Sequence, residues 1–193
     1  MALLLLLSAP AVARAGLLEV WPKGAEFLSE ALVEQVKAIP GVAKVERYLY
    51  VKARPHPVIG VEAGSPLRII TGEGKLITPK LEAGRPFEAG DERVAIVGKV
   101  YREDYGLGDG MMAMMKHPFE VGSSFTFPGT RERIRVVGKF AEAAAVFLPL
   151  TTAQRLFDMK GKTSYLFVHA DDAEGVAREI RRGLGDSVEV VSR

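Results

Sequence analysis

Two segments with the same order of patterns, strand then helix then strand, lie at opposite ends of the chain. In the first, an apolar stretch at residues 17–21 precedes apolar positions at helical spacing across residues 27–39, and residues 42–53 are rich in β-branched and aromatic residues. In the second, a strand pattern at residues 164–170 precedes a helical pattern and a further strand at residues 187–191. Two such units can pair as a split ferredoxin-like sheet, so we predict an α+β fold with a lobe built from both chain ends.

Between these units the pattern changes to short apolar runs separated by proline and glycine, which is typical of short strands and turns. We predict a hairpin turn at Pro128-Gly129-Thr130, and a small helix with a threonine cap after Thr151-Thr152. A short helix is predicted at residues 99–105 and a loop at residues 106–118. The predicted strands are residues 58–61, 67–70, 93–97, 124–127, 131–140 and 146–148.

These patterns predict how the chain is divided. Residues 16–53 and 162–193 form the two halves of the α/β lobe, and residues 54–161 form an inserted β-rich lobe. Within the second half, Asp171 or Asp172 begins the helix, and Gly183 or Gly185 ends it.

Residues 1–15 differ from the rest of the chain. Residues 3–12 form an apolar run that leads into Ala13-Arg14-Ala15 and then Gly16, which matches a small-x-small cleavage site of an export signal. No Lys or Arg precedes the leucines, and ten apolar residues are too few for a membrane core that needs roughly 20. Both a signal peptide and a truncated membrane anchor therefore stay open. Either one places the folded part outside the cytoplasm, in the periplasm or its extracytoplasmic equivalent.

The composition excludes several classes of function. Zero cysteines excludes thiol catalysis, Cys-ligated zinc and disulfide frameworks. The charges are balanced, with 26 Lys and Arg against 24 Asp and Glu. Arg131, Arg133 and Arg135 alternate as on the solvated face of a strand whose other face holds Ile134 and Val136. We therefore expect no nucleic-acid partner.

One short cluster contains groups that could perform acid/base chemistry or bind a metal. His169, Asp171 and Asp172 lie within four residues, and imidazole and carboxylate are common ligands for hard or borderline cations. The favoured interpretation is structural, because His169 ends a strand and either aspartate can cap the following helix.

Other patterns lack the context that their chemistry needs. Residues 71–75 have neither the spacing nor the following helix of a phosphate-binding loop, so we predict a β-turn there. Gly106, Gly108 and Gly110 have no strand-to-helix crossover around them. No G-x-S-x-G elbow places a serine beside a base. We therefore predict no catalytic residue, no cofactor and no enzyme. The serines and histidines considered for such a triad are Ser123, Ser124, His56, His117 and His169.

Four of the six methionines lie in one loop that is bounded by glycine and proline. Thioether and imidazole ligands suit Cu(I), so copper binding by a stand-alone periplasmic protein is the alternative function. The favoured interpretation is an adaptable contact surface, because methionine is flexible and polarizable. The copper candidates are Met111, Met112, Met114, Met115 and His117.

Four blocks, taken in order, resemble the extracytoplasmic core domain of MacB- and FtsX-type ABC transporter permeases. The resemblance covers most of residues 17–191 as an ordered pattern of weak motifs. The blocks are VKAIPGV at residues 36–42, GRPF with RVAIVG at residues 84–98, VGSS with IRVVG at residues 121–138, and FLPLTTAQRL at residues 147–156.

The resemblance implies a two-lobe domain, with one α/β lobe similar to transporter porter domains and one inserted β-rich lobe. It also implies that this domain is held between the first and second transmembrane helices of a permease and is thereby associated with the cell membrane. Such a domain binds no ATP and catalyses nothing; it contacts substrates or envelope partners and transmits conformational change driven by a cytoplasmic ABC ATPase. The implied partners are the membrane-embedded permease segments, that ATPase and a periplasmic or envelope protein. The chain itself has no Walker A motif, and no stretch after Val12 is long and apolar enough to span a membrane.

Overall fold

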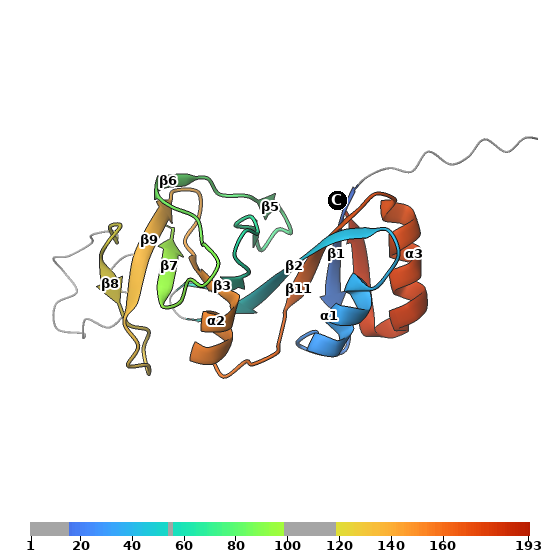
Figure 1. The fold of residues 1–193 in the computed structure, drawn as a ribbon, viewed down its shortest axis with the longest axis horizontal. Helices are drawn as coiled ribbons and strands as arrows, with labels where there is room; N and C mark the ends of the chain where they lie inside the picture. Colours follow the sequence, from blue (N-terminus) through green and yellow to red (C-terminus); the bar gives the residue numbers. More distant parts are fainter. Residues whose placement is uncertain (1–15, 54–55, 99–118) are drawn as a thin grey trace, which may run out of the picture.

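The computed structural model describes residues 16–53, 56–98 and 119–193, and one half of it is a four-stranded antiparallel sheet with two helices on one face (Figure 1). The strand order is β12-β1-β11-β2. This is the split ferredoxin-like arrangement predicted from the two ends of the chain, and we call it the α/β half. Its elements are β1 (Gly16–Pro22), α1 (Glu30–Lys37), β2 (Val42–Val51), β11 (Tyr165–Ala170), α3 (Ala173–Leu184), the 3₁₀ turn η2 (Gly185–Ser187) and β12 (Val188–Ser192).

The other half of the molecule is rich in short strands, as predicted, and one helix lies among its described residues (Figure 1). The strand order continues as β3-β10-β7-β9-β6, and β8 pairs with β9. The β3–β10 and β7–β9 pairs are parallel. We call this the β-rich half. Its elements are β3 (Val58–Val61), β4 (Ile69–Ile70), β5 (Leu76–Ile77), β6 (Leu81–Gly84), β7 (Val94–Val97), β8 (Ser124–Phe125), β9 (Ile134–Phe140), β10 (Val146–Pro149) and α2 (Leu150–Leu156).

The two halves share one continuous ten-stranded sheet, which the sequence did not lead us to expect. The join is β2, whose Tyr48 is paired with Tyr165 of β11 on one side and with Val61 of β3 on the other. In Figure 1, β2 and β11 run from the α/β half toward the β-rich half. Relative movement of the halves must therefore bend or twist these strands.

Alternation along the strands gives the α/β half two different faces. Leu18 and Leu166 face α1 and α3, where they pack with helix residues such as Val33 and Ile180. The intervening residues, such as Phe167, face the opposite side. On that side the β4–β5 hairpin takes the place of a helix, because its isoleucines and leucines pack into the same cluster as Phe167.

Several local predictions were correct. The side chain of Asp172 accepts a hydrogen bond from the Gly175 N–H and caps α3, and Gly185 ends that helix. The 71–75 segment is the turn of the β4–β5 hairpin, closed by the Gly74 N–H on the Thr71 carbonyl at 2.8 Å. The predicted turn at Pro128-Gly129-Thr130 connects β8 and β9, which are antiparallel.

Other local predictions were wrong. No side chain caps α2: it starts at Leu150, so Thr151 and Thr152 lie inside the helix and Thr152 is buried in the core. β9 begins at Ile134, so Arg135 alone of the three arginines lies on its exposed face. Strands β5 and β6 were not predicted.

Three predicted segments lie outside the described residues: the export signal or anchor at 1–15, the short helix at 99–105 and the methionine loop at 106–118. Among the residues that the structure describes, no helix is long and apolar enough to cross a membrane.

Candidate functional site

An aromatic groove with a volume of about 340 Å³ lies where the two halves meet, on the face opposite α1 and α3. The rings of Trp21 and Tyr165 stack with their centroids 4.6 Å apart, and Tyr165 stacks in turn on Tyr48 at 5.3 Å. Tyr50 also lines the groove and is 43% exposed. We call this site the aromatic groove.

Both halves of the molecule build the aromatic groove. Trp21 lies near the end of β1, Tyr50 lies near the end of β2, and Tyr165 begins β11, so three strands of the α/β half contribute at the join. The β-rich half contributes Ile59 from β3 and Ile70 from the β4–β5 hairpin. An occupant would therefore contact both halves at once.

Ser164 lines the aromatic groove and fixes the backbone of the strand beside it. Its hydroxyl accepts a hydrogen bond from the Tyr50 N–H at 2.9 Å and lies 3.3 Å from the Tyr50 carbonyl, to which it donates. The Ser164 N–H donates to the Tyr48 carbonyl at 2.7 Å. These bonds tie the beginning of β11 to β2 and leave the Tyr50 ring on a rigid backbone.

A second groove, of about 680 Å³, lies on the helix side of the same join, and half of the residues that line it are charged. Arg47 and Tyr50 are three residues apart on β2, so their side chains point to opposite faces. The guanidinium of Arg47 donates to both carboxylate oxygens of Glu30, at 2.8 and 2.6 Å, and lies 3.7 Å from Glu62. We call this site the carboxylate groove.

Two acidic groups of the carboxylate groove have shifted pKa values in opposite directions. Burial raises the pKa of Glu62 and outweighs the positive charge of Arg47. The guanidinium of Arg85 makes two hydrogen bonds to Asp91, at 2.7 and 2.9 Å, and lowers the pKa of that carboxyl. Two carboxylates of the groove, Glu30 and Asp91, are thus each paired with an arginine of the same chain.

The face of the α/β half opposite α1 and α3, which we call the helix-free face, also holds a carboxylate that is almost fully buried. Glu46 on β2 is 1% exposed and contacts Arg68 at 3.1 Å, Lys44 at 3.1 Å and His169 at 2.9 Å. Burial by itself would raise the pKa of Glu46, but the hydrogen bonds and charges of Lys44, Arg68 and His169 hold the pKa below its ordinary value. Arg68 also lies over the ring of Phe167, 4.7 Å from its centroid.

Glu19 is a second such carboxylate, on β1, which β11 separates from β2, and it is 2% exposed. The Arg193 guanidinium donates to its two oxygens at 2.7 and 3.1 Å, and also to the Gly74 carbonyl at the tip of the β4–β5 hairpin at 3.0 Å. The indole N–H of Trp21 donates to the same carboxylate at 3.2 Å. Glu19 and Arg193 thus connect the end of β12 to the β4–β5 hairpin and to the aromatic groove.

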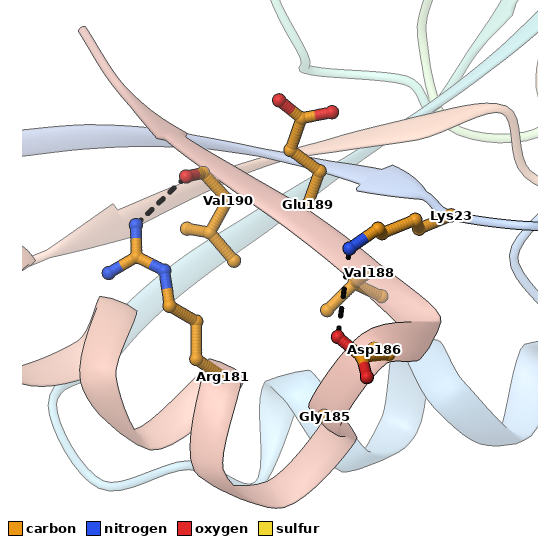
Figure 2. Close-up of a pocket in the computed structure, with 7 residues that line it drawn as sticks. All are labelled: Lys23, Arg181, Gly185, Asp186, Val188, Glu189 and Val190. Carbon is orange, nitrogen blue, oxygen red and sulfur yellow. Dashed lines mark hydrogen bonds and ion pairs between the residues drawn. The ribbon is translucent and has the colours of Figure 1, made fainter.

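A third depression, of about 590 Å³, lies beside the edge strand β12 (Figure 2). Figure 2 shows Arg181 of α3 reaching the Val190 carbonyl, to which it donates at 2.9 Å, and Lys23 facing Asp186 at 3.6 Å. Arg181 therefore occupies a backbone acceptor of the edge strand, which protects this edge against pairing with another chain.

The structure gives the residues of the predicted acid/base cluster separate roles. His169 contacts Glu46, Asp172 caps α3, and Asp171 is exposed. The Ser123 hydroxyl donates to the Glu120 carbonyl in an exposed turn. In residues 16–53, 56–98 and 119–193, no three His, Cys, Asp or Glu side chains are placed to hold a metal ion. The copper candidates Met111, Met112, Met114, Met115 and His117 lie outside these ranges.

The aromatic groove was not predicted from the sequence. Three of the aromatic residues that line it come from positions 21, 50 and 165, and nothing in a single sequence indicates that these positions meet. One signal was present, because Tyr48 and Tyr50 alternate on one strand and must share a face. That signal identifies an aromatic strand face but not the groove beside it.

The chain is similar to one protein family and to solved structures of transporter domains. The family described as MacB-like periplasmic core domain matches residues 6–182. The crystal structure of the extracellular domain of the noncanonic ABC-type transporter YknZ from Gram-positive bacteria superimposes with a TM-score of 0.62 at 15% identity, covering 91% of this chain and 99% of that one. The periplasmic region of MacB from Actinobacillus actinomycetemcomitans gives a TM-score of 0.62 at 11% identity, covering 93% and 89%. No curated protein sequence matches the chain.

Proposed function

The chain belongs to the family of MacB-like periplasmic core domains, and from that membership we propose that it is the non-catalytic extracytoplasmic domain of an ABC transporter permease. In this proposal the domain contacts a substrate or an envelope partner and relays conformational change. Its partners are membrane-embedded permease segments and, through them, a cytoplasmic ABC ATPase. Residues 1–15 act as the export signal or as part of a membrane anchor.

The observation that carries the proposal is the closeness of the two ends of the folded domain. β1 and β12 are neighbours in the sheet, and the Arg193 N–H donates to the Leu17 carbonyl at 2.9 Å. A domain held between two membrane segments must receive the chain and return it at one place. The neighbouring strands β1 and β12 meet this requirement.

The relay is supported by the way in which the halves are joined. We propose residues 16–53 and 162–193 as one lobe and residues 54–161 as the inserted lobe. A force applied near Arg193 would reach Glu19 and the Gly74 carbonyl directly, because the Arg193 guanidinium bonds both. The hairpin that carries Gly74 also carries Ile70, which lines the aromatic groove. Movement at the ends of the domain would therefore change the shape of that groove.

Topology reporters test the proposed location. The full chain, beginning at Met1, is fused after Arg193 either to alkaline phosphatase, which is active only after export, or to green fluorescent protein, which is fluorescent in the cytoplasm. We expect high phosphatase activity and little fluorescence, as for an exported control protein. The reverse pattern, with strong fluorescence and no phosphatase activity, would contradict the proposal.

A further inference from the structure

The aromatic groove has the size and lining of a small-ligand site. Its volume of about 340 Å³ lies near the lower end of the range of roughly 300–1,000 Å³ that is usual for ligand pockets. That volume admits a single ring with a short substituent. Its walls are mostly aromatic and aliphatic side chains, with few polar groups, which is also typical of such sites.

The aromatic faces are placed to receive a ligand and not only to fill the core. Tyr165, at 2% exposed, forms the packed wall, whereas Tyr50 is one of the most exposed large hydrophobic side chains in the described part of the molecule. Trp21 lies between solvent and the stacked Tyr165 ring. Rigid aromatic rings on a fixed backbone bind a partner with little loss of conformational entropy.

The charge at the rim indicates the sign of the ligand. Glu26 lines the groove and is exposed, and among the described residues its carboxylate has neither an ion-pair nor a hydrogen-bond partner. A cation in the groove would be attracted both by this carboxylate and by the electron-rich rings of Trp21 and Tyr50. An anion would be repelled by both.

The chain itself shows that rings on this side of the molecule attract cations. Lys162 places its ammonium 5.1 Å from the centroid of Phe27, which lines the groove. Arg68 lies 4.7 Å from the centroid of Phe167, on the same helix-free face. Lys162 is not among the residues that line the groove, and in the described part of the chain no Lys or Arg lies over the ring of Tyr50 or over Trp21, which uses one face to stack on Tyr165.

We propose that the aromatic groove binds a small organic cation, an ammonium group carried on a body of one aromatic ring or of similar size. Trp21 and Tyr50 contact the ammonium group and the apolar body, and Glu26 balances the charge. The role of this binding in transport rests on the proposed function, but the binding itself needs only the folded chain.

The test uses the intrinsic fluorescence of the purified full chain, because Trp21 is its only tryptophan and lines the groove. Benzyltrimethylammonium is titrated beside the neutral benzyl alcohol and the anionic benzoate. We expect a saturable change in emission with the cation, and a Kd at least about 5-fold lower than for benzyl alcohol, since a cation–ring contact contributes about 1 kcal/mol. Equal affinity for cation and alcohol, or no saturable change with the cation, would overturn the proposal.

Variants assign the binding to the groove. Glu26→Gln should raise the Kd for the cation about 3-fold or more and leave that for benzyl alcohol unchanged, and Tyr50→Ala should raise the cation Kd about 10-fold. The matched control is Glu82→Gln, which removes an equally exposed carboxylate from β6 at the far edge of the sheet and should change neither Kd. If Glu26→Gln and Glu82→Gln have the same effect, the proposal is wrong.

Because the titration uses purified protein and the topology reporters use cells, failure of one leaves the other result intact. An exported chain without cation binding would refute the ligand class alone. A cytoplasmic chain that binds the cation would refute the proposed location alone. Should Tyr50→Ala fail to fold, the exposed Glu26 substitution still decides the outcome.

Discussion

Glu46 of β2 and Arg68 of the segment before β4 form an ion pair, with the Arg68 Nε 3.1 Å from the Glu46 Oε2. The side chains are only 1% and 12% exposed. The Tyr48 hydroxyl, beside them, donates to the Pro66 carbonyl at 2.6 Å. Together these contacts hold the start of the β4–β5 hairpin on the helix-free face of the α/β half, and with it one wall of the aromatic groove.

Removing the charge of Glu46 should destabilise the protein strongly. Glu46→Gln leaves Arg68 with a buried charge and no full counter-charge, so we expect a loss of about 3 kcal/mol in the free energy of unfolding. Urea denaturation measures this loss. The control is Glu34→Gln, which breaks the exposed Glu34–Lys37 pair at 2.9 Å and should cost less than about 0.5 kcal/mol. Equal effects of the two substitutions would show that the buried pair is not important.

The pH dependence of stability should differ between two glutamates. The folded-state pKa of Glu46 is lowered, so its stabilisation is present above about pH 4.5 and is lost as the pH falls through the folded pKa. The pKa of Glu62 is raised, so its favourable contribution is present below pH 4.5 and is lost as the pH rises. At pH 7 we therefore expect Glu46→Gln to destabilise and Glu62→Gln to stabilise slightly. Unfolding curves at pH 4 and pH 7 measure both effects, and a destabilised Glu62→Gln at pH 7 would contradict the assigned direction.

The two adjacent aspartates before α3 should respond differently to substitution. Asp172→Ala removes the cap on the Gly175 N–H, which lies 3.0 Å from the Asp172 carboxylate, and should cost about 1 kcal/mol. Asp171→Ala changes an exposed side chain and should stay within about 0.5 kcal/mol of the unsubstituted protein. Thermal denaturation of both variants checks this. A larger effect at Asp171 would reverse the assignment of the cap.

The packing of α2 on β3 should not tolerate a methyl group at Gly60. A Cβ at this position would lie 2.8 Å from the Cβ of Ala153 and 3.3 Å from that of Leu49. We expect Gly60→Ala to cost about 1–3 kcal/mol, because the helix must move away from the strand. The control is Gly72→Ala, where no atom lies within 4 Å and the backbone is not left-handed, so stability should be unchanged or slightly higher. Equal unfolding midpoints for the two variants would contradict the close approach.

The α/β half could be predicted because its signals are local. Helical spacing, the capping residue Asp172 and the stop at Gly185 act within a few residues, and the order of elements then restricts the topology to few choices. The strands β5 and β6 were missed because they span two and four residues and have only partly buried or exposed side chains, so they lack a distinct apolar pattern.

The site could not be predicted because it depends on pairings between distant parts of the chain. Tyr48 and Tyr165 are partners across the sheet although 117 positions separate them (165 − 48). Glu46 reads in the sequence as an ordinary exposed strand residue, and only the folded hairpin with Arg68 buries it. Such contacts follow from the whole sheet rather than from any local pattern.

The most direct test of the account is whether the folded domain lies outside the cytoplasm of living cells. The chain contains no cysteine, so Glu34→Cys on the exposed face of α1 creates a single thiol. Spheroplasts expressing this variant are treated with a membrane-impermeant maleimide before and after lysis, beside a cytoplasmic single-cysteine protein. The account predicts equal labelling of the thiol before and after lysis; labelling that appears only after lysis would contradict it.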